Sequence, residues 1–250
     1  MLLLACPRNG EPRPITDPPP ITLGWKWVPG DSIQMELSSQ ATTRPNRDEQ
    51  TVTRVEVWEY LVRDVDHDGV ATLEGRMTGL GAEVLRDDER MNDRDTRRAR
   101  EHEMADAQPI TLRIAMDGRL VSLEGRDWAE GLPHRLLAQQ LSVEPIEQGA
   151  TWPDPVVARP YADLVPVDLE LTVEGYQTFE GLYEIDGTVL AQLSTRGAVR
   201  PDEAGAPEIW INGESWWDPA RGRMTSRELR VVLANDEGPG ELTLRAREIR

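Results

Sequence analysis

A β-hairpin can be read directly from residues 111–124, whose sequence is TLRIAMDGRLVSLE. Apolar residues alternate with polar ones on both sides of Asp117-Gly118, as expected for two strands that each bury one face. An Asp-Gly pair between alternating runs is a strong hairpin signal, because both central residues of a type I′ turn need positive φ. The stretch therefore predicts two antiparallel strands and a tight turn whose glycine a β-branched residue could not replace without strain.

Alternation of this kind recurs along most of the chain. In the first half it marks residues 33–37 and 55–61, and a turn over 66–69 leads into a return strand over 70–77. In the second half it marks 169–185, 189–193, 209–211, 229–233 and 242–249, with another Asp-Gly turn at 186–187. The predicted fold class is mainly β, a curled antiparallel sheet or half-barrel built from hairpins. Each half has a long hairpin and then a shorter one, which fits a duplication with halves 25–141 and 142–250.

Three stretches depart from the strand pattern. Residues 128–141 carry leucines at helical spacing and predict a helix that caps the sheet, so one or two short helices are expected in all. Residues 86–106 are charged with both signs and predict a solvated helix or an excursion between strands. The Pro, Gly and acidic residues of 198–207 predict a loop.

Length and charge narrow the class of protein. The chain has 250 residues, 45 of them acidic and 28 basic, for a net charge of −17. This charge argues against nucleic acid as a partner and against electrostatic docking on anionic lipid. The length suits one all-β domain or two small ones, and no run approaches the roughly 18 apolar residues of a membrane-spanning helix.

Cys6 is the only cysteine, and its setting points to export. Leu3-Leu4-Ala5-Cys6 resembles the lipobox of bacterial lipoproteins, in which the cysteine is lipidated. Only five residues precede it, so either the start codon lies further upstream or the match is accidental. Six prolines between positions 7 and 20 predict an extended tether. The chain is thus divided into a signal and lipobox remnant (1–6), a proline-rich tether (7–24) and an antiparallel β domain (25–250).

Asp64, Asp66, Asp68 and Gly69 match the first six positions of a calcium-binding loop. The twelfth position holds Gly75 in place of the bidentate glutamate, and the flanking residues predict strands where such a loop has helices. The three aspartates are a metal candidate without its closing ligand, so a solvated hairpin turn is expected. No cofactor is predicted.

Eight tryptophans stand against a single phenylalanine. Trp210, Trp216 and Trp217 fall close together and are candidate ligand-binding residues, because exposed indoles can stack on sugars or line an apolar groove. Packing in the core is the alternative. As neighbours in a strand, Trp216 and Trp217 must point to opposite faces.

Motifs that identify common enzymes are missing from the sequence. It has no G-x-S-x-G elbow, no P-loop, no G-x-G-x-x-G turn and no histidines at metal-ligand spacing. Two carboxylates brought together by the fold could still hydrolyse a glycan, but among 45 acidic residues such a pair is uninformative. No catalytic residue is assigned, and the sequence favours a binding module over an enzyme.

Several turn and core motifs resemble a known family. Residues 149–152 (GATW), 185–187 (IDG), 213–218 (GESWWD) and 222–224 (GRM) are similar to the pattern of uncharacterised bacterial lipoproteins that share a curled antiparallel sheet. The resemblance implies an exported, lipid-anchored domain distantly similar to the half-barrel lipoprotein carriers, whose concave sheet can hold acyl chains.

We therefore expect an exported bacterial lipoprotein of the cell envelope, anchored to the membrane through Cys6 and facing the periplasm or the cell surface. Its expected role is a non-catalytic binding or scaffolding module, and its partner an envelope protein or a hydrophobic small molecule. Two alternatives stay open. One is a carrier that holds lipid in an apolar cavity, and the other is an enzyme that acts on envelope glycans.

Overall fold

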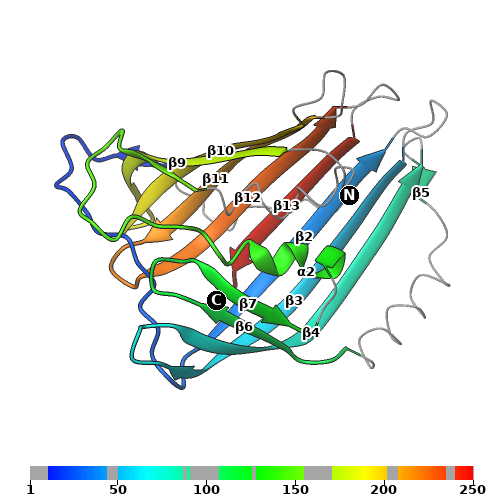
Figure 1. The fold of residues 1–250 in the computed structure, drawn as a ribbon, viewed down its shortest axis with the longest axis horizontal. Helices are drawn as coiled ribbons and strands as arrows, with labels where there is room; N and C mark the ends of the chain where they lie inside the picture. Colours follow the sequence, from blue (N-terminus) through cyan, green and yellow to red (C-terminus); the bar gives the residue numbers. More distant parts are fainter. Residues whose placement is uncertain are drawn as a thin grey trace.

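One antiparallel sheet of 13 strands forms most of the computed structural model (Figure 1). The structure describes residues 11–43, 50–86, 89–90, 107–125, 128–154, 171–201, 208–234 and 240–249. The strands are β1 (Arg13–Pro14), β2 (Ser32–Thr43), β3 (Gln50–Val65), β4 (Ala71–Arg86), β5 (Glu89–Arg90), β6 (Ile110–Ile114), β7 (Leu120–Glu124), β8 (Thr151–Pro153), β9 (Leu171–Ile185), β10 (Thr188–Pro201), β11 (Glu208–Asp218), β12 (Arg223–Ala234) and β13 (Gly240–Glu248). The predicted fold class, mainly β and antiparallel, is confirmed.

The order of the strands follows from a chain that folds as successive hairpins. Across the sheet it runs β1-β9-β10-β11-β12-β13-β2-β3-β4-β6-β7, with β5 beside β4 and β8 beside β9. Most neighbours are consecutive in sequence, as short connections favour. In the middle of the sheet β13 lies antiparallel to β2, and this pairing joins the first half of the chain to the second. Both halves therefore contribute to one continuous sheet.

Alternating side chains give this sheet two unlike faces. We define the inner face as the one that packs against α2 (Trp128–Arg135), and the sheet curls so that the helix lies inside it (Figure 1). The outer face carries charged side chains that pair across strands, such as Arg245 with Glu228 and Arg230 with Glu241. A buried face and a solvated face are what period-2 alternation provides in an antiparallel sheet.

The helix is shorter than the 128–141 that the leucine spacing predicts, because α2 ends at Arg135. Pro133 has no N–H to donate, and the residues after the helix make tighter i to i+3 bonds, such as Leu136 N to Pro133 O at 3.2 Å. Leu136, Leu137 and Leu141 are nevertheless buried, since the chain continues across the inner face. The predicted helix exists and covers the sheet, but its predicted length is wrong.

The two Asp-Gly turns have different geometries. At Asp186 and Gly187 both residues have positive φ, 49° and 74°, as a type I′ turn requires. At Asp117-Gly118 the glycine alone has positive φ, 81°, and its N–H donates to Ala115 O at 2.8 Å. That hairpin therefore closes with a type I turn followed by a left-handed glycine, and the predicted type I′ turn is wrong there.

The proline-rich stretch is attached to the fold from Arg13 onward. β1 pairs with Tyr183 and Glu184 of β9, and Ile21 exchanges backbone hydrogen bonds with Ile146 at 3.0 and 2.8 Å. The predicted tether over residues 7–24 therefore includes residues that pair with the rest of the fold from Arg13 onward.

Two segments that the sequence predicts to be irregular include strand residues. The loop predicted over 198–207 is wrong in its first part, because β10 continues to Pro201 and residues 202–207 lie outside the described residues. Of the charged stretch 86–106, the structure describes Arg86, Glu89 and Arg90, which are strand residues in β4 and β5.

Replacing Gly118 with alanine is expected to destabilise the protein more than replacing Gly187. Both glycines have φ values that strain any L-residue. A Cβ on Gly118 would also lie 1.8 Å from Gln139 O, whereas nothing lies within 4 Å of one on Gly187. We expect losses of about 1 kcal/mol for Gly187→Ala and about 3 kcal/mol or more for Gly118→Ala in urea unfolding. Equal losses would contradict the close approach to Gln139.

Candidate functional site

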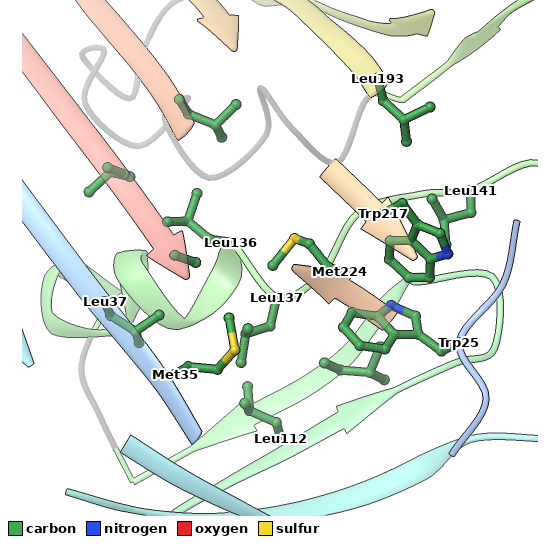
Figure 2. Close-up of a cluster of buried hydrophobic side chains, with 14 of the residues drawn as sticks. Trp25, Met35, Leu37, Leu112, Leu136, Leu137, Leu141, Leu193, Trp217 and Met224 are labelled. Atoms are coloured by element: carbon green, nitrogen blue, oxygen red, sulfur yellow. The ribbon is translucent and has the colours of Figure 1, made fainter. Parts of the chain in front are cut away.

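One end of the inner face is filled by packed aromatic and aliphatic side chains (Figure 2). Trp25 stacks on Trp27 with ring centroids 4.3 Å apart, and it meets Trp217 of β11 edge to face at 4.8 Å. Leu141 lies beside Trp217 and comes from residues 136–154, which we call the strap because they cross the inner face after α2 (Figure 2). The aromatic packing closes this end of the sheet.

A band of buried polar side chains fastens the strap to the sheet. We call this band the polar seam, and its members are Gln139 and Asp154 of the strap with Gln177, Thr195, Ser215 and Arg227 of β9, β10, β11 and β12. Gln139 Nε2 donates to Gln177 Oε1 at 2.9 Å and to Ser215 Oγ at 2.8 Å. Buried polar groups are costly unless they are hydrogen bonded, so these bonds fix where the strap lies.

The orientation of the seam's amides follows from its carboxylate. Gln177 Nε2 donates to Asp154 Oδ2 at 2.7 Å, so the amide nitrogen of Gln177 faces the strap. Gln177 Oε1 is then the acceptor for both Gln139 Nε2 and Thr195 Oγ1, the latter at 3.0 Å. Gln139 of the strap therefore donates to Gln177 of the sheet, and Gln177 in turn donates to Asp154 of the strap.

Arg227 completes the seam by capping the chain after α2. Its Nη1 donates to Leu136 O at 3.2 Å and to Ala138 O at 2.6 Å. The last carbonyls of a helix and of the turn that follows have no partners within the helix, and a buried cation satisfies them well. A side chain of β12 thus supplies the C-terminal cap of a segment nearly a hundred residues earlier.

A second polar group holds α2 itself on the sheet. Tyr60 Oη and His134 Nδ1 are 2.7 Å apart, and His134 Nε2 lies 3.9 Å from Glu56 Oε2. The same carboxylate oxygen accepts the indole N–H of Trp58 at 2.6 Å. Glu56 is 5 % exposed and His134 is fully buried, so this acid and imidazole lie under the helix and anchor it.

Beyond α2, on one side of the sheet, side chains of the inner face become partly exposed. Along β3, Trp58 is fully buried, the side chain of Arg54 is 30 % exposed and Val52 is 39 % exposed. Partly exposed aliphatic residues continue this surface onto the neighbouring strands, and we call them the apolar ledge: Ala41, Val52, Leu80, Leu233 and Leu242. Leu242, Ala41 and Val52 are direct cross-strand neighbours on β13, β2 and β3. These three side chains form a contiguous apolar row, and Leu233 and Leu242 pack against the hydrophobic core.

The three candidate tryptophans do not form one site. Trp217 is buried on the inner face, whereas Trp210 and Trp216 lie on the outer face of β11. The guanidinium of Arg200 lies 4.5 Å from the ring centroid of Trp210, and Trp216 Nε1 donates to Glu214 at 2.6 Å. The predicted opposite orientation of Trp216 and Trp217 is confirmed, and ligand binding by the three remains a prediction.

The three candidate aspartates lie at the turn between β3 and β4, where Asp66 organises the turn. Its Oδ1 accepts the N–H of Val70 at 2.9 Å and that of Asp68 at 3.1 Å, and its Oδ2 lies 3.0 Å from Arg113 Nη2. The hydrogen bond from Val70 is the main cause that lowers the pKa of Asp66. Asp64 and Asp68 are exposed. In the part of the chain that the structure describes, no group of three or more His, Cys, Asp and Glu side chains is arranged to hold a metal ion.

Two further predictions concern the membrane. Cys6 lies outside the described residues. Among those that are described, no helix has the length and apolarity needed to cross a bilayer.

Sequence reasoning missed the polar seam, because its members are far apart in the chain. Gln139 and Ser215 are separated by 76 residues, and no motif links them. The available signal was the alternation along each strand, which shows the positions that face the core. Gln177, Thr195 and Ser215 occupy inner-facing positions, where alternation otherwise places apolar residues.

Comparison with known proteins identifies a fold and no family. No family model matches the chain, and no curated protein sequence matches it. Among solved structures, one described as "Lipid-protein interactions in lipovitellin" matches with a TM-score of 0.55 and 11 % identity, covering 90 % of this chain and 26 % of that one. The chain thus spans about a quarter of the lipovitellin chain and shares with it a large antiparallel sheet.

A second solved structure is DynF from the dynemicin biosynthesis pathway of Micromonospora chersina, at 9 % identity. The match covers 96 % of this chain and 92 % of that one, with a TM-score of 0.22. That score is too low to indicate a common fold.

Gln139→Leu is expected to destabilise the protein by about 1–3 kcal/mol, because it removes the donor to Gln177 and Ser215 while both remain buried. Gln192→Leu is the matched control, since Gln192 donates to Glu214 at 2.8 Å on the exposed face. We expect its effect to stay within about 0.5 kcal/mol. Equal effects of the two variants in chemical denaturation would show that the seam does not hold the strap.

Proposed function

We propose that this protein is a non-catalytic binding module whose apolar ledge holds the hydrophobic part of a ligand. The observation that carries the proposal is the ledge itself, a set of partly exposed aliphatic side chains on adjacent strands that continues the core past α2. Contiguous exposed apolar surface on a soluble fold is characteristic of binding sites. The carrier of a lipid or other hydrophobic molecule is thus favoured over a purely scaffolding role.

The arrangement of rigid and apolar parts supports this proposal. The strap is fixed by the polar seam and α2 by Glu56 and His134, so the covered end of the inner face is preorganised. The ledge adds apolar surface beside this covered end. Each buried Å² of apolar surface contributes about 25 cal/mol, so a long hydrocarbon chain gains binding energy without any specific polar contact.

The likeness to lipovitellin supports the proposal only through the fold. That structure concerns lipid–protein interactions in lipovitellin, and at 11 % identity the match indicates the fold alone. A large curled antiparallel sheet is an architecture on which an apolar inner face can be exposed to a ligand. An enzyme acting on glycans has less support, because the acid and imidazole described above are buried under α2.

The proposed setting is the bacterial cell envelope, with Cys6 as a lipid anchor and the protein related to the half-barrel lipoprotein carriers. This part of the proposal rests on the sequence of residues 3–6 and on the prolines that follow. The residues between Cys6 and β1 would then connect the membrane to β1, which pairs with β9.

Ligand binding can be tested with the neutral dye N-phenyl-1-naphthylamine, whose fluorescence rises in apolar surroundings. Leu233→Glu is expected to weaken dye binding about tenfold or more, since it places a charge on the ledge. Val232→Glu is the control, because Val232 is the neighbouring residue of β12 and faces outward. Native mass spectrometry of the protein as purified should also show a hydrophobic adduct.

Two results count against the proposal. Absence of saturable dye binding to the wild type would remove it, and equal weakening by the two glutamates would move the site away from the inner face.

The anchor can be tested separately by expressing the chain behind a bacterial secretion leader that ends in this lipobox. The wild type is expected to fractionate with membranes, because two or more acyl chains hold a protein on a bilayer, while Cys6→Ser is expected to be released. Identical partitioning of the two proteins would exclude lipidation at Cys6.

A further inference from the structure

The outer face of β9, β10 and β11 carries two open aromatic side chains. Tyr176 of β9 is 46 % exposed and Trp210 of β11 is 40 % exposed, and these are the most exposed aromatic residues in the part of the chain that the structure describes. An aromatic ring that faces water has a flat apolar surface, and the C–H groups of a sugar ring can pack against such a surface. The two rings are therefore candidate contacts for a ligand on the face opposite the ledge.

Arg196 of β10 lies between the two aromatic strands and has an open guanidinium. It is the direct cross-strand neighbour of Tyr176 on one side and of Asn212 on the other. The side chains of Arg196 and Asn212 are both exposed, and neither makes a hydrogen bond or an ion pair with any residue that the structure describes. Both planar polar groups are thus available to a ligand.

The nearby arginines of the outer face have carboxylate partners. Arg200 Nη1 lies 2.9 Å from Glu174 Oε2, and Arg230 Nη2 lies 2.7 Å from Glu241 Oε2. Arg196 differs from them although the chain has 45 acidic residues. A carboxylate of a ligand would complement this charge, and a guanidinium can bind both oxygens of a carboxylate at once.

The geometry of the strands sets the distance between the two aromatic residues. Trp210 and Tyr176 lie two strands and two residues apart, which places their Cα atoms about 10 Å apart across the sheet and about 7 Å apart along it. The guanidinium of Arg200, held by Glu174, lies 4.5 Å from the ring centroid of Trp210 and fixes this ring before a ligand arrives. Two rings at this spacing, with Arg196 between their strands, suit successive units of one chain-like ligand.

We propose that this outer-face surface, made of Tyr176, Arg196, Trp210 and Asn212, binds an acidic oligosaccharide. Sugar rings stack on the two aromatic side chains, the carboxylate of a hexuronate unit binds Arg196, and the amide of Asn212 bonds to sugar hydroxyls. Polar side chains separate the aromatic rings, so the surface lacks the contiguous apolar patch typical of the centre of a protein interface. A ligand that is itself both polar and ringed fits it better.

The charge of the whole chain determines how this recognition works. With a net charge of −17, long-range attraction does not favour an anion. Selectivity for the acid must therefore come from short, directional hydrogen bonds at Arg196. The site lies on the opposite face of the sheet from the ledge, so the inference does not depend on the proposed function.

The test compares two ligands that differ only in charge, tetragalacturonate and its fully methyl-esterified form. Binding of each to the full chain is measured by titration calorimetry. For the wild type we expect the acid to bind about tenfold more tightly than the ester, which corresponds to one charge-assisted contact. Arg196→Gln should lower the affinity for the acid to that for the ester and leave the ester unchanged, and Arg196→Lys should recover part of the loss.

Variants of the aromatic residues test the stacking. Tyr176→Ala and Trp210→Ala should each weaken both ligands about fivefold, because both forms present the same sugar rings. Tyr176→Phe keeps the ring and should bind like the wild type. All of these side chains are exposed, and urea unfolding of each variant checks that the fold is unchanged.

Arg245→Gln is the matched control for Arg196, since Arg245 is 43 % exposed and pairs with Glu228 at 2.6 Å on the outer face. It should leave both affinities unchanged. Equal affinity of the wild type for the acid and the ester would overturn the inference, as would the absence of binding by either, and neither comparison needs a variant. Binding that survives both alanine substitutions would also overturn it. Dye binding at the ledge is unaffected in each case, so the proposed function is judged separately.

Discussion

The strap crosses a buried face almost without helix or strand, so its backbone N–H and C=O groups need partners that regular structure does not provide. Arg227 supplies two of them by bonding to Leu136 O and Ala138 O. The Asp117 carbonyl supplies another by accepting the N–H of Leu141 at 2.7 Å. The side chain of Gln139 adds bonds to Gln177 of β9 and Ser215 of β11, and Thr195 of β10 donates to the same Gln177 oxygen. Irregular chain can cover the apolar inner face because the polar seam provides these hydrogen bonds.

The polar seam also divides the inner face into two regions with different chemistry. On one side of the polar seam the strap and the stacked tryptophans exclude water, and the packing is that of an ordinary core. On the other side, along β12, β13, β2, β3 and β4, aliphatic side chains become partly exposed. A polar boundary beside an apolar surface is the arrangement that an amphiphile matches.

The sequence predicts features that depend on neighbours along the chain. Period-2 alternation and the Asp-Gly pairs identify the strands and hairpins, because a half-buried strand and a tight turn are local constraints. The turn type at Asp117-Gly118 is predicted wrongly, since the buried glycine lies against Gln139, which belongs to another part of the fold. The end of α2 and the attachment of β1 depend on distant partners in the same way.

The candidate site is less predictable for a related reason. Trp217 is a core residue, and Trp210 and Trp216 pack on the other face, so closeness in sequence says little about closeness in a strand. The residues of the ledge are small and common aliphatics, and only the cross-strand register brings Leu242, Ala41 and Val52 together.

The pairing of β13 with β2 determines when the protein can finish folding. Glu241 and Thr42 are partners although they lie near opposite ends of the sequence. While the chain is being synthesised, β2 has no neighbour on that side, and the two halves present unpaired strand edges. Such non-local pairing is slow to form, and open edges are where intermolecular association begins. The fold is thus completed only after translation has delivered β13, and a chain that ends before this strand leaves an adhesive edge in the centre of the molecule.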